Sequence, residues 1–185
     1  MGDVRPEHGG AHDDQGQPPG RAPTVPPPRA HVITASNRAS AGVYEDRSGQ
    51  ALAAGLAELG FTVSGPEVLP DDVAVLTAAL GAAVDSGAEV IVTTGGTGLS
   101  PTDITPEATE PVLDRQVPGL AEVLRRYGQD QTPYAVLSRG LVGTAGRSLV
   151  VNLPGSTGGV RDGLAVLGPL LGHIVSQLRG GDHQP

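Results

Sequence analysis

An uninterrupted apolar segment that runs straight into a cluster of glycines most constrains how this chain folds. Residues 89–93 lack the polar–apolar alternation of a half-buried strand, and such runs are typical of a parallel strand covered on both faces. Three glycines follow within positions 95–98. Thr105-Pro106 then fits a helix start, with Thr at the N-cap and Pro at N1. A strand, a glycine loop and a helix in direct succession predict one unit of an α/β fold.

Apolar spacing along the rest of the chain predicts further elements of the same kind. Strands are predicted over 31–35, 61–69 (interrupted by Gly65-Pro66), 89–93 and 148–152. Helices are predicted over 48–59, 71–85, 105–115, 119–128 and 133–139, with one or two more over 158–167 and 169–178. This order predicts a three-layer α/β/α sandwich with a mainly parallel sheet. Ligands of such sheets bind outside the carboxyl ends of the strands, where both Gly-rich loops are expected.

The first 29 residues have a different composition, with seven Pro and five Gly and almost no large apolar side chain. Such a segment cannot bury enough surface to offset its ordering entropy, so we expect a disordered tail over 1–29. One domain over 30–180 and a flexible end over 181–185 complete the predicted organisation. The tail lacks the apolar stretch of a secretory signal, and no later run is long enough for a bilayer. We therefore expect a cytoplasmic protein without a membrane partner.

Missing residue types narrow the chemistry that the chain can perform. It has no cysteine, and all twelve of its basic residues are Arg, so thiolate chemistry, Schiff bases and the lysine of a Walker-A loop are excluded. A net charge of −8 with scattered arginines argues against a nucleic-acid partner. Carboxylates, hydroxyls, amides and backbone N–H groups remain, and this set suits Mg²⁺ and phosphate.

The loop after residues 89–93 contains Gly95, Gly96, Thr97 and Gly98, whose backbone N–H groups can converge on an anion. A tight turn that binds no ligand explains the glycines equally well. Asp103 favours the binding interpretation, because a carboxylate beside a phosphate calls for a cation such as Mg²⁺ between them. Its alternative role is to cap the following helix.

Polar residues at other predicted strand or helix ends are weaker candidates. Asp71 begins a predicted helix and is either a catalytic carboxylate or a cap. The other candidates for binding an anionic substrate are the first-strand residue Ser36, the pair Ser138 and Arg139, and the second-loop residues Asn152, Pro154, Gly155 and Ser156.

Taken in chain order, seven segments resemble the molybdopterin adenylyltransferase family, which includes the Mog and MoaB proteins and the G domain of gephyrin-type proteins. The run G-G-T-G-x-x-x-x-D-x-T-P-E-A-T at 95–109 is the most specific of them. The matching segments together cover about residues 31–178, and they lie at 32–36, 42–49, 69–72, 95–109, 117–120, 137–139 and 151–156.

The resemblance implies that Mg-ATP and molybdopterin bind side by side, and that the terminal phosphate of molybdopterin attacks the α-phosphorus of ATP. It places the family's two functional aspartates, catalytic and metal-binding, on Asp71 and Asp103. It assigns the nucleotide phosphates to 95–98, and the pterin with its phosphate to Ser138, Arg139, Asn152, Gly155 and Ser156. A homotrimer or hexamer, and hand-off of the product to a molybdenum-inserting enzyme, are also implied.

Two positions depart from the family pattern, which often has Arg where this chain has Thr102 and Asp where it has Asn37. Loss of the Arg removes a fixed positive charge near the polyphosphate. A non-catalytic molybdopterin-binding or scaffold protein of the same fold is therefore the alternative to the enzyme.

Overall fold

The structure is a computed structural model that describes residues 26–181. A six-stranded sheet with the order β2-β1-β3-β6-β5-β4 forms its centre. Strands β2, β1, β3 and β6 are parallel, whereas β5 and β4 are antiparallel additions at one edge. The strands are β1 (Arg29–Ala35), β2 (Thr62–Leu69), β3 (Val90–Thr94), β4 (Arg115–Gln116), β5 (Val142–Ala145) and β6 (Ser148–Leu153).

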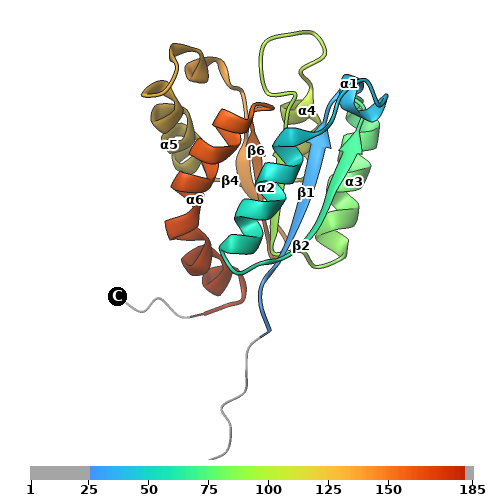
Figure 1. Cartoon of the computed structure of the whole chain (residues 1–185). Helices are drawn as coiled ribbons and strands as arrows, with labels where there is room; N and C mark the ends of the chain where they lie inside the picture. Colours follow the sequence, from blue (N-terminus) through green and yellow to red (C-terminus); the bar gives the residue numbers. More distant parts are fainter. Residues whose placement is uncertain (1–25, 182–185) are drawn as a thin grey trace, which may run out of the picture.

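Helices cover both faces of this sheet (Figure 1). Helices α2, α5 and α6 pack on one face, and α3 and α4 pack on the other. Strand β3 supplies both cores, because successive side chains of a strand point to opposite faces: Val90 and Val92 enter the first core, and Ile91 enters the second. The predicted three-layer α/β/α sandwich is confirmed. The helices are α1 (Asn37–Ser40), α2 (Arg47–Glu58), α3 (Val73–Asp85), α4 (Thr105–Thr109), α5 (Pro118–Gln129) and α6 (Thr157–Leu178), with 3₁₀ turns η1 (Glu110–Val112) and η2 (Pro133–Leu137).

The helix predicted over 105–115 is wrong beyond Thr109. The chain passes through η1 and becomes β4, where Arg115 pairs with Thr144 of β5. Antiparallel pairing therefore overrides the helical spacing of this segment. Strands β4 and β5 were missed because each is short, but a signal exists: β5 and β6 are joined by the two-residue turn Gly146-Arg147, and Gly146 has φ +56°.

Smaller differences concern the ends of elements. The segment 133–139 is a 3₁₀ turn rather than a longer helix. A single helix, α6, replaces the one or two predicted at the C-terminus, and it continues through exposed Pro169 because Leu167 and Leu171 on either side are buried against the sheet. The interruption expected at Gly65-Pro66 is a shift in the register between β1 and β2, not a break in the strand.

The predicted tail and C-terminal end lie mostly outside the described residues. Arg29, placed in the tail by the sequence, is the first residue of β1. Within residues 26–181, the structure contains no helix long and apolar enough to cross a membrane.

Candidate active site

Both Gly-rich loops leave the sheet at the carboxyl ends of two adjacent parallel strands, as expected. Thr94 at the end of β3 is in register with Leu153 at the end of β6. The backbone N–H of Gly95 donates to the Leu153 carbonyl at 3.0 Å, and the Thr94 hydroxyl donates to the Pro154 carbonyl at 2.9 Å. The loops therefore begin as one connected surface above the centre of the sheet.

Two glycines of the β3–α4 loop are required by the backbone geometry. Gly95 has φ +99° and Gly96 has φ +62°, a region that L side chains rarely adopt. A Cβ atom on Gly95 would lie 2.2 Å from the Ala35 carbonyl oxygen, and one on Gly96 would lie 2.4 Å from Thr105 Oγ1. Thr105 is not the N-cap predicted for it. It lies inside α4, where its hydroxyl donates to the Gly95 carbonyl at 2.9 Å and closes the loop.

Arg139 braces this loop from the other side. Its Nε donates to the Gly98 carbonyl at 2.8 Å, and its Nη2 donates to the Asp103 carbonyl at 2.5 Å. Its backbone N–H donates to the Thr97 carbonyl at 2.8 Å. Nη1 forms an ion pair with the Glu107 carboxylate at the start of α4. One side chain thus holds both ends of the segment between Gly98 and Asp103.

The charge of Arg139 is paired with that of Glu107 at a partly exposed position. The hydrogen bond from Arg139 holds the pKa of Glu107 below its ordinary value, and the same bond raises the pKa of Arg139. Both groups stay ionised near neutral pH. Every nitrogen of the Arg139 guanidinium therefore donates either to a loop carbonyl or to Glu107. Contact with an anionic substrate, which the sequence predicts for Arg139, would come in addition to these bonds.

Asp103 is anchored by the loop and does not cap α4. Its Oδ2 accepts a hydrogen bond from the Ser100 N–H at 2.9 Å, and the residue before α4 makes no side-chain cap. A Cβ atom on Gly98 would lie 2.8 Å from Asp103 Oδ2, so the carboxylate lies directly against the glycine loop. The capping alternative for Asp103 is wrong.

Asp71 is held by a reciprocal pair of hydrogen bonds with Asn37. Its Oδ2 accepts from the Asn37 N–H at 2.9 Å, and its own N–H donates to Asn37 Oδ1 at 3.0 Å. Asp72, not Asp71, caps α3, so the capping alternative for Asp71 is also wrong. A Cβ atom on Gly96 would lie 3.5 Å from Asp71 Oδ1. Asp71 and Asp103 thus flank the same glycine loop. Ser36 lies next to Asn37 and caps α1 through its hydroxyl.

The two aspartates suit a divalent cation that is shared with a phosphate. In each carboxylate Oδ2 is anchored by a backbone N–H, whereas Oδ1 accepts no hydrogen bond from the described part of the chain. Within residues 26–181 no three His, Cys, Asp or Glu side chains gather to form a complete metal site. Mg²⁺ is commonly bound in this way, by one or two carboxylates, substrate phosphates and water.

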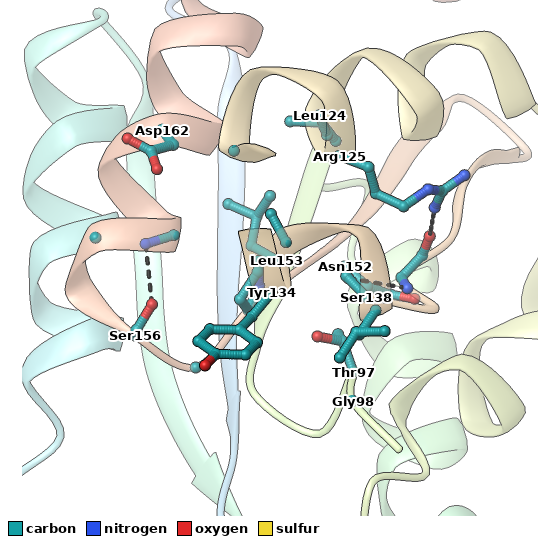
Figure 2. Close-up of a pocket in the computed structure, with 18 of the residues that line it drawn as sticks. Thr97, Gly98, Leu124, Arg125, Tyr134, Ser138, Asn152, Leu153, Ser156 and Asp162 are labelled. Atoms are coloured by element: carbon teal, nitrogen blue, oxygen red, sulfur yellow. Dashed lines mark hydrogen bonds between the residues drawn. The ribbon is translucent and has the colours of Figure 1, made fainter. Parts of the chain in front are cut away.

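A pocket of about 620 Å³ extends from the glycine loop to the wall formed by α5 and α6 (Figure 2). Nine of the predicted site residues line it: Gly96, Thr97, Gly98, Asp103, Ser138, Asn152, Pro154, Gly155 and Ser156. Four of them do not. Gly95 forms the junction of the two loops, Arg139 braces the glycine loop, and Ser36 and Asp71 lie on the α1 side of it.

Two lining residues of the β6 end are already engaged in the fold. The Asn152 amide donates to the hydroxyls of Thr93 and Thr109 at 3.1 and 3.0 Å, and its Oδ1 accepts from the Leu141 N–H. Ser156 caps α6 by accepting from the Gly159 N–H at 3.0 Å, as drawn in Figure 2. Asn152 is 3% exposed, so its main role is to fix β6 against α4.

Comparisons with known proteins match this geometry to one family. Residues 31–173 match the family described as a probable molybdopterin binding domain. The chain belongs to this family. The molybdopterin adenylyltransferase of Helicobacter pylori (strain ATCC 700392 / 26695) is 38% identical over 155 residues, which cover 80% of this chain and 86% of that protein.

Two further relatives show how much of the chain shares this fold and sequence. A molybdopterin biosynthesis Mog protein from Mycobacterium ulcerans shares the fold with a TM-score of 0.78 and 47% identity, over 82% of this chain and 99% of that one. The molybdenum cofactor biosynthesis bifunctional protein of Chlorobaculum tepidum is 38% identical over 84% of this chain. The chain spans only about half (50%) of the length of that bifunctional relative.

In this molybdopterin-binding domain, sequence reasoning missed the α5 and η2 side of the pocket. Leu124, Arg125 and Gly128 of α5 and Tyr134 of η2 line it (Figure 2). Positions 121, 124, 125 and 128 follow the i, i+3, i+4, i+7 spacing of one helix face, and this signal was available in the sequence. Asp162 of α6 was also missed.

Proposed function

We propose that this chain is a molybdopterin adenylyltransferase. The terminal phosphate oxygen of molybdopterin attacks the α-phosphorus of ATP, the bond between the α-phosphorus and the bridging oxygen breaks, and pyrophosphate leaves. The observation that carries the proposal is the pair of anchored carboxylates, Asp71 and Asp103, on either side of the glycine loop. The names of relatives such as the Helicobacter pylori enzyme support the substrates.

The residues present fit a bound Mg²⁺, because Asp71 and Asp103 each keep one oxygen free of hydrogen bonds from the described residues. When bound, the ion would neutralise charge on the polyphosphate. The protein supplies position and fixed dipoles, which dominate phosphoryl-type transfer. The backbone of Gly96 to Gly98 binds nucleotide phosphate, and the second loop, near Ser156, binds the substrate beside it.

The structure offers a physical reason why the departure at position 37 is compatible with catalysis. Asn37 makes both of its bonds to Asp71 through its main-chain N–H and its side-chain oxygen, and an Asp at that position has the same two groups. Thr102 lacks the positive charge of an Arg, and Arg139, which donates to the Asp103 carbonyl of the same loop, has its charge paired with Glu107. The contacts of Asn37 favour the enzyme over a non-catalytic scaffold, whereas the change at Thr102 has no structural compensation in this loop.

Incubation of the protein with molybdopterin, ATP and Mg²⁺ tests the proposal. We expect adenylyl-molybdopterin and pyrophosphate in equal amounts, measured by chromatography and a pyrophosphate-coupled assay. Tight binding of molybdopterin without any product would contradict the enzyme and support the scaffold protein.

We further place the reaction in the cytoplasm, where ATP is available, and propose a homotrimer or hexamer that hands its product to a molybdenum-inserting enzyme. The resemblance to the Mog and MoaB proteins supports this assembly. Light scattering on the purified chain measures the mass of the oligomer, and a monomer at micromolar concentration would contradict it.

A further inference from the structure

The α6 wall of the pocket has one carboxylate that the roles proposed above do not use. Asp162 follows Gly158 by four residues and Gly159 by three, so the three residues share a face of α6. All three line the pocket. Neither glycine has a side chain, and Arg161, which also lines the pocket, is 78% exposed, so Asp162 is the more buried of the two charged side chains that this stretch of α6 presents to the pocket. Its side chain is only 14% exposed.

Asp162 has no evident structural partner that explains its burial. It is the sixth residue of α6, beyond the first turn in which a carboxylate interacts well with the helix dipole, and Ser156 already caps the helix. No group among residues 26–181 donates a hydrogen bond to its carboxylate, and its ion pair with Arg161 is long, at 3.9 Å, with an Arg side chain that is 78% exposed. This carboxylate therefore keeps free acceptor capacity at the pocket wall, where N–H donors of a ligand can meet it.

The surroundings of Asp162 suit a flat aromatic ring better than a phosphate. Leu124 of α5, Leu153 of β6 and Tyr134 of η2 supply apolar walls. In the view of Figure 2, Asp162 and Ser156 lie at one side of the pocket, and the glycine loop lies at the other, with Tyr134 between them. Two arginines also line the pocket, but Arg125 donates to the Gly140 carbonyl and the Arg161 side chain is 78% exposed. A phosphate next to Asp162 would be repelled by its carboxylate, so we place the anionic end of a ligand at the loops and its neutral ring beside Asp162.

We propose that the Asp162 carboxylate accepts hydrogen bonds from the 2-amino-4-oxo edge of the pterin and so selects pterin over adenine. This assignment rests on the proposed function. That edge presents two adjacent donors, the N3–H and the 2-amino group, which match the two oxygens of one carboxylate. Adenine presents its amino group between two ring-nitrogen acceptors, so it offers one hydrogen bond and one repulsive contact. The α5–α6 half of the pocket is therefore the pterin half.

The carboxylate-to-amide variant tests the proposal by separating the two substrates. An amide in place of Asp162 turns one acceptor into a donor that faces a pterin N–H. For Asp162→Asn we expect KM for molybdopterin to rise by about 10- to 100-fold, as when a site loses hydrogen bonds to its substrate. KM for ATP stays within about twofold, because the nucleotide lies at the other half. An unchanged KM for molybdopterin, or an equal rise for both substrates, overturns the proposal.

A second variant blocks the space in front of Asp162. A Cβ atom on Gly158 would meet no atom within 4 Å, so Gly158→Leu leaves the fold intact and fills the pocket instead. Gly172→Leu is the matched control, because Gly172 is also in α6 with open space around it, but it lies away from this pocket. We expect Gly158→Leu to abolish binding of unsubstituted pterin, followed by its fluorescence, and Gly172→Leu to bind it as the wild type does.

Pterin binding without ATP also distinguishes this proposal from the function on which it rests. If the wild type binds pterin and Asp162→Asn does not, the role of Asp162 is supported. If the wild type at the same time forms no adenylyl product, the adenylyltransferase proposal is contradicted. An active chain whose Asp162→Asn variant binds pterin normally contradicts the assignment alone. A wild type that binds no pterin overturns the assignment.

Discussion

The two loops that meet above β3 and β6 both line the pocket, but they are held in place by different contacts. The β3–α4 loop is ten residues long, from Gly95 to Ile104, whereas the β6–α6 loop is only the three residues 154–156. The long loop is closed by Thr105 and braced by Arg139, which is 41 residues away from Gly98 in sequence. The short loop is closed by Ser156, which caps the helix that follows it.

The difference in length explains why the two loops are fixed by different kinds of contact. A long loop loses more conformational entropy when it is fixed, so it needs contacts from elsewhere in the chain. A short loop between a strand and a helix needs only a local cap. We therefore expect the long loop to be sensitive to distant substitutions, and the short loop to depend mainly on its own cap and on the Thr94 hydroxyl that donates to the Pro154 carbonyl.

The largest expected effect follows from removing charge at the long loop. Asp103→Asn keeps an oxygen for the Ser100 N–H but removes the negative charge that a cation needs. We expect kcat to fall by about 100-fold or more, the size typical of lost electrostatic stabilisation. Initial rates with Mg²⁺, ATP and molybdopterin measure it. Asp72→Asn is the control, since Asn also caps α3; similar losses in both variants would refute a special role for Asp103.

Removing the distant brace should have the next largest effect. Arg139→Gln loses the ion pair with Glu107 and the bonds to two loop carbonyls. Because the pair is partly exposed, we expect a loss of about 1–2 kcal/mol in the free energy of unfolding, together with about a tenfold lower kcat/KM. Urea unfolding and initial rates measure the two effects. Exposed Arg126→Gln is the control, and equal effects in both variants would show that Arg139 braces nothing.

The short loop should respond to its own cap. Ser156→Ala removes the acceptor for the Gly159 N–H, and we expect the free energy of unfolding to fall by about 1 kcal/mol. Ser156→Thr keeps a capping hydroxyl and should stay within a few tenths of a kcal/mol of the wild type. Thermal unfolding of the three proteins provides the comparison. A Thr variant as unstable as the Ala variant would contradict the local closure of this loop.

The smallest expected effect is a pH dependence of the brace. The pKa of Glu107 is lowered from its ordinary value of 4.5, so its ion pair stabilises the fold above that value and is lost as the pH falls through the lowered pKa. Since both partners are partly exposed, the contribution is below about 1 kcal/mol. Wild type and Glu107→Gln should differ in urea midpoint at pH 7 and converge as the pH falls through the lowered pKa of Glu107. A difference that persists in acid would rule out the ion pair as its cause.

The end of the sheet that carries the glycine loop could be predicted from the sequence because its signals are local. The apolar centre of β3 predicts a buried parallel strand, and the glycines at 95 and 96 are required by backbone angles that other residues rarely adopt. Asp103 lies within the same short stretch as these glycines. Each of these features depends on neighbouring residues along the chain, so the sequence alone indicates an anion-binding loop with a carboxylate beside it.

Tertiary structure decided the features that depend on residues far apart in the chain. Strand β4 exists because Arg115 pairs with Thr144, although its own sequence favours a helix. Arg139 looks like a surface substrate ligand in sequence, but packing places it against Gly98 and makes it a brace. The sequence by itself determined the glycine loop and its carboxylate. Only the packing of α5 and α6 over the sheet brought Asp162 into the same pocket, because contacts between distant segments carry no local sequence signal.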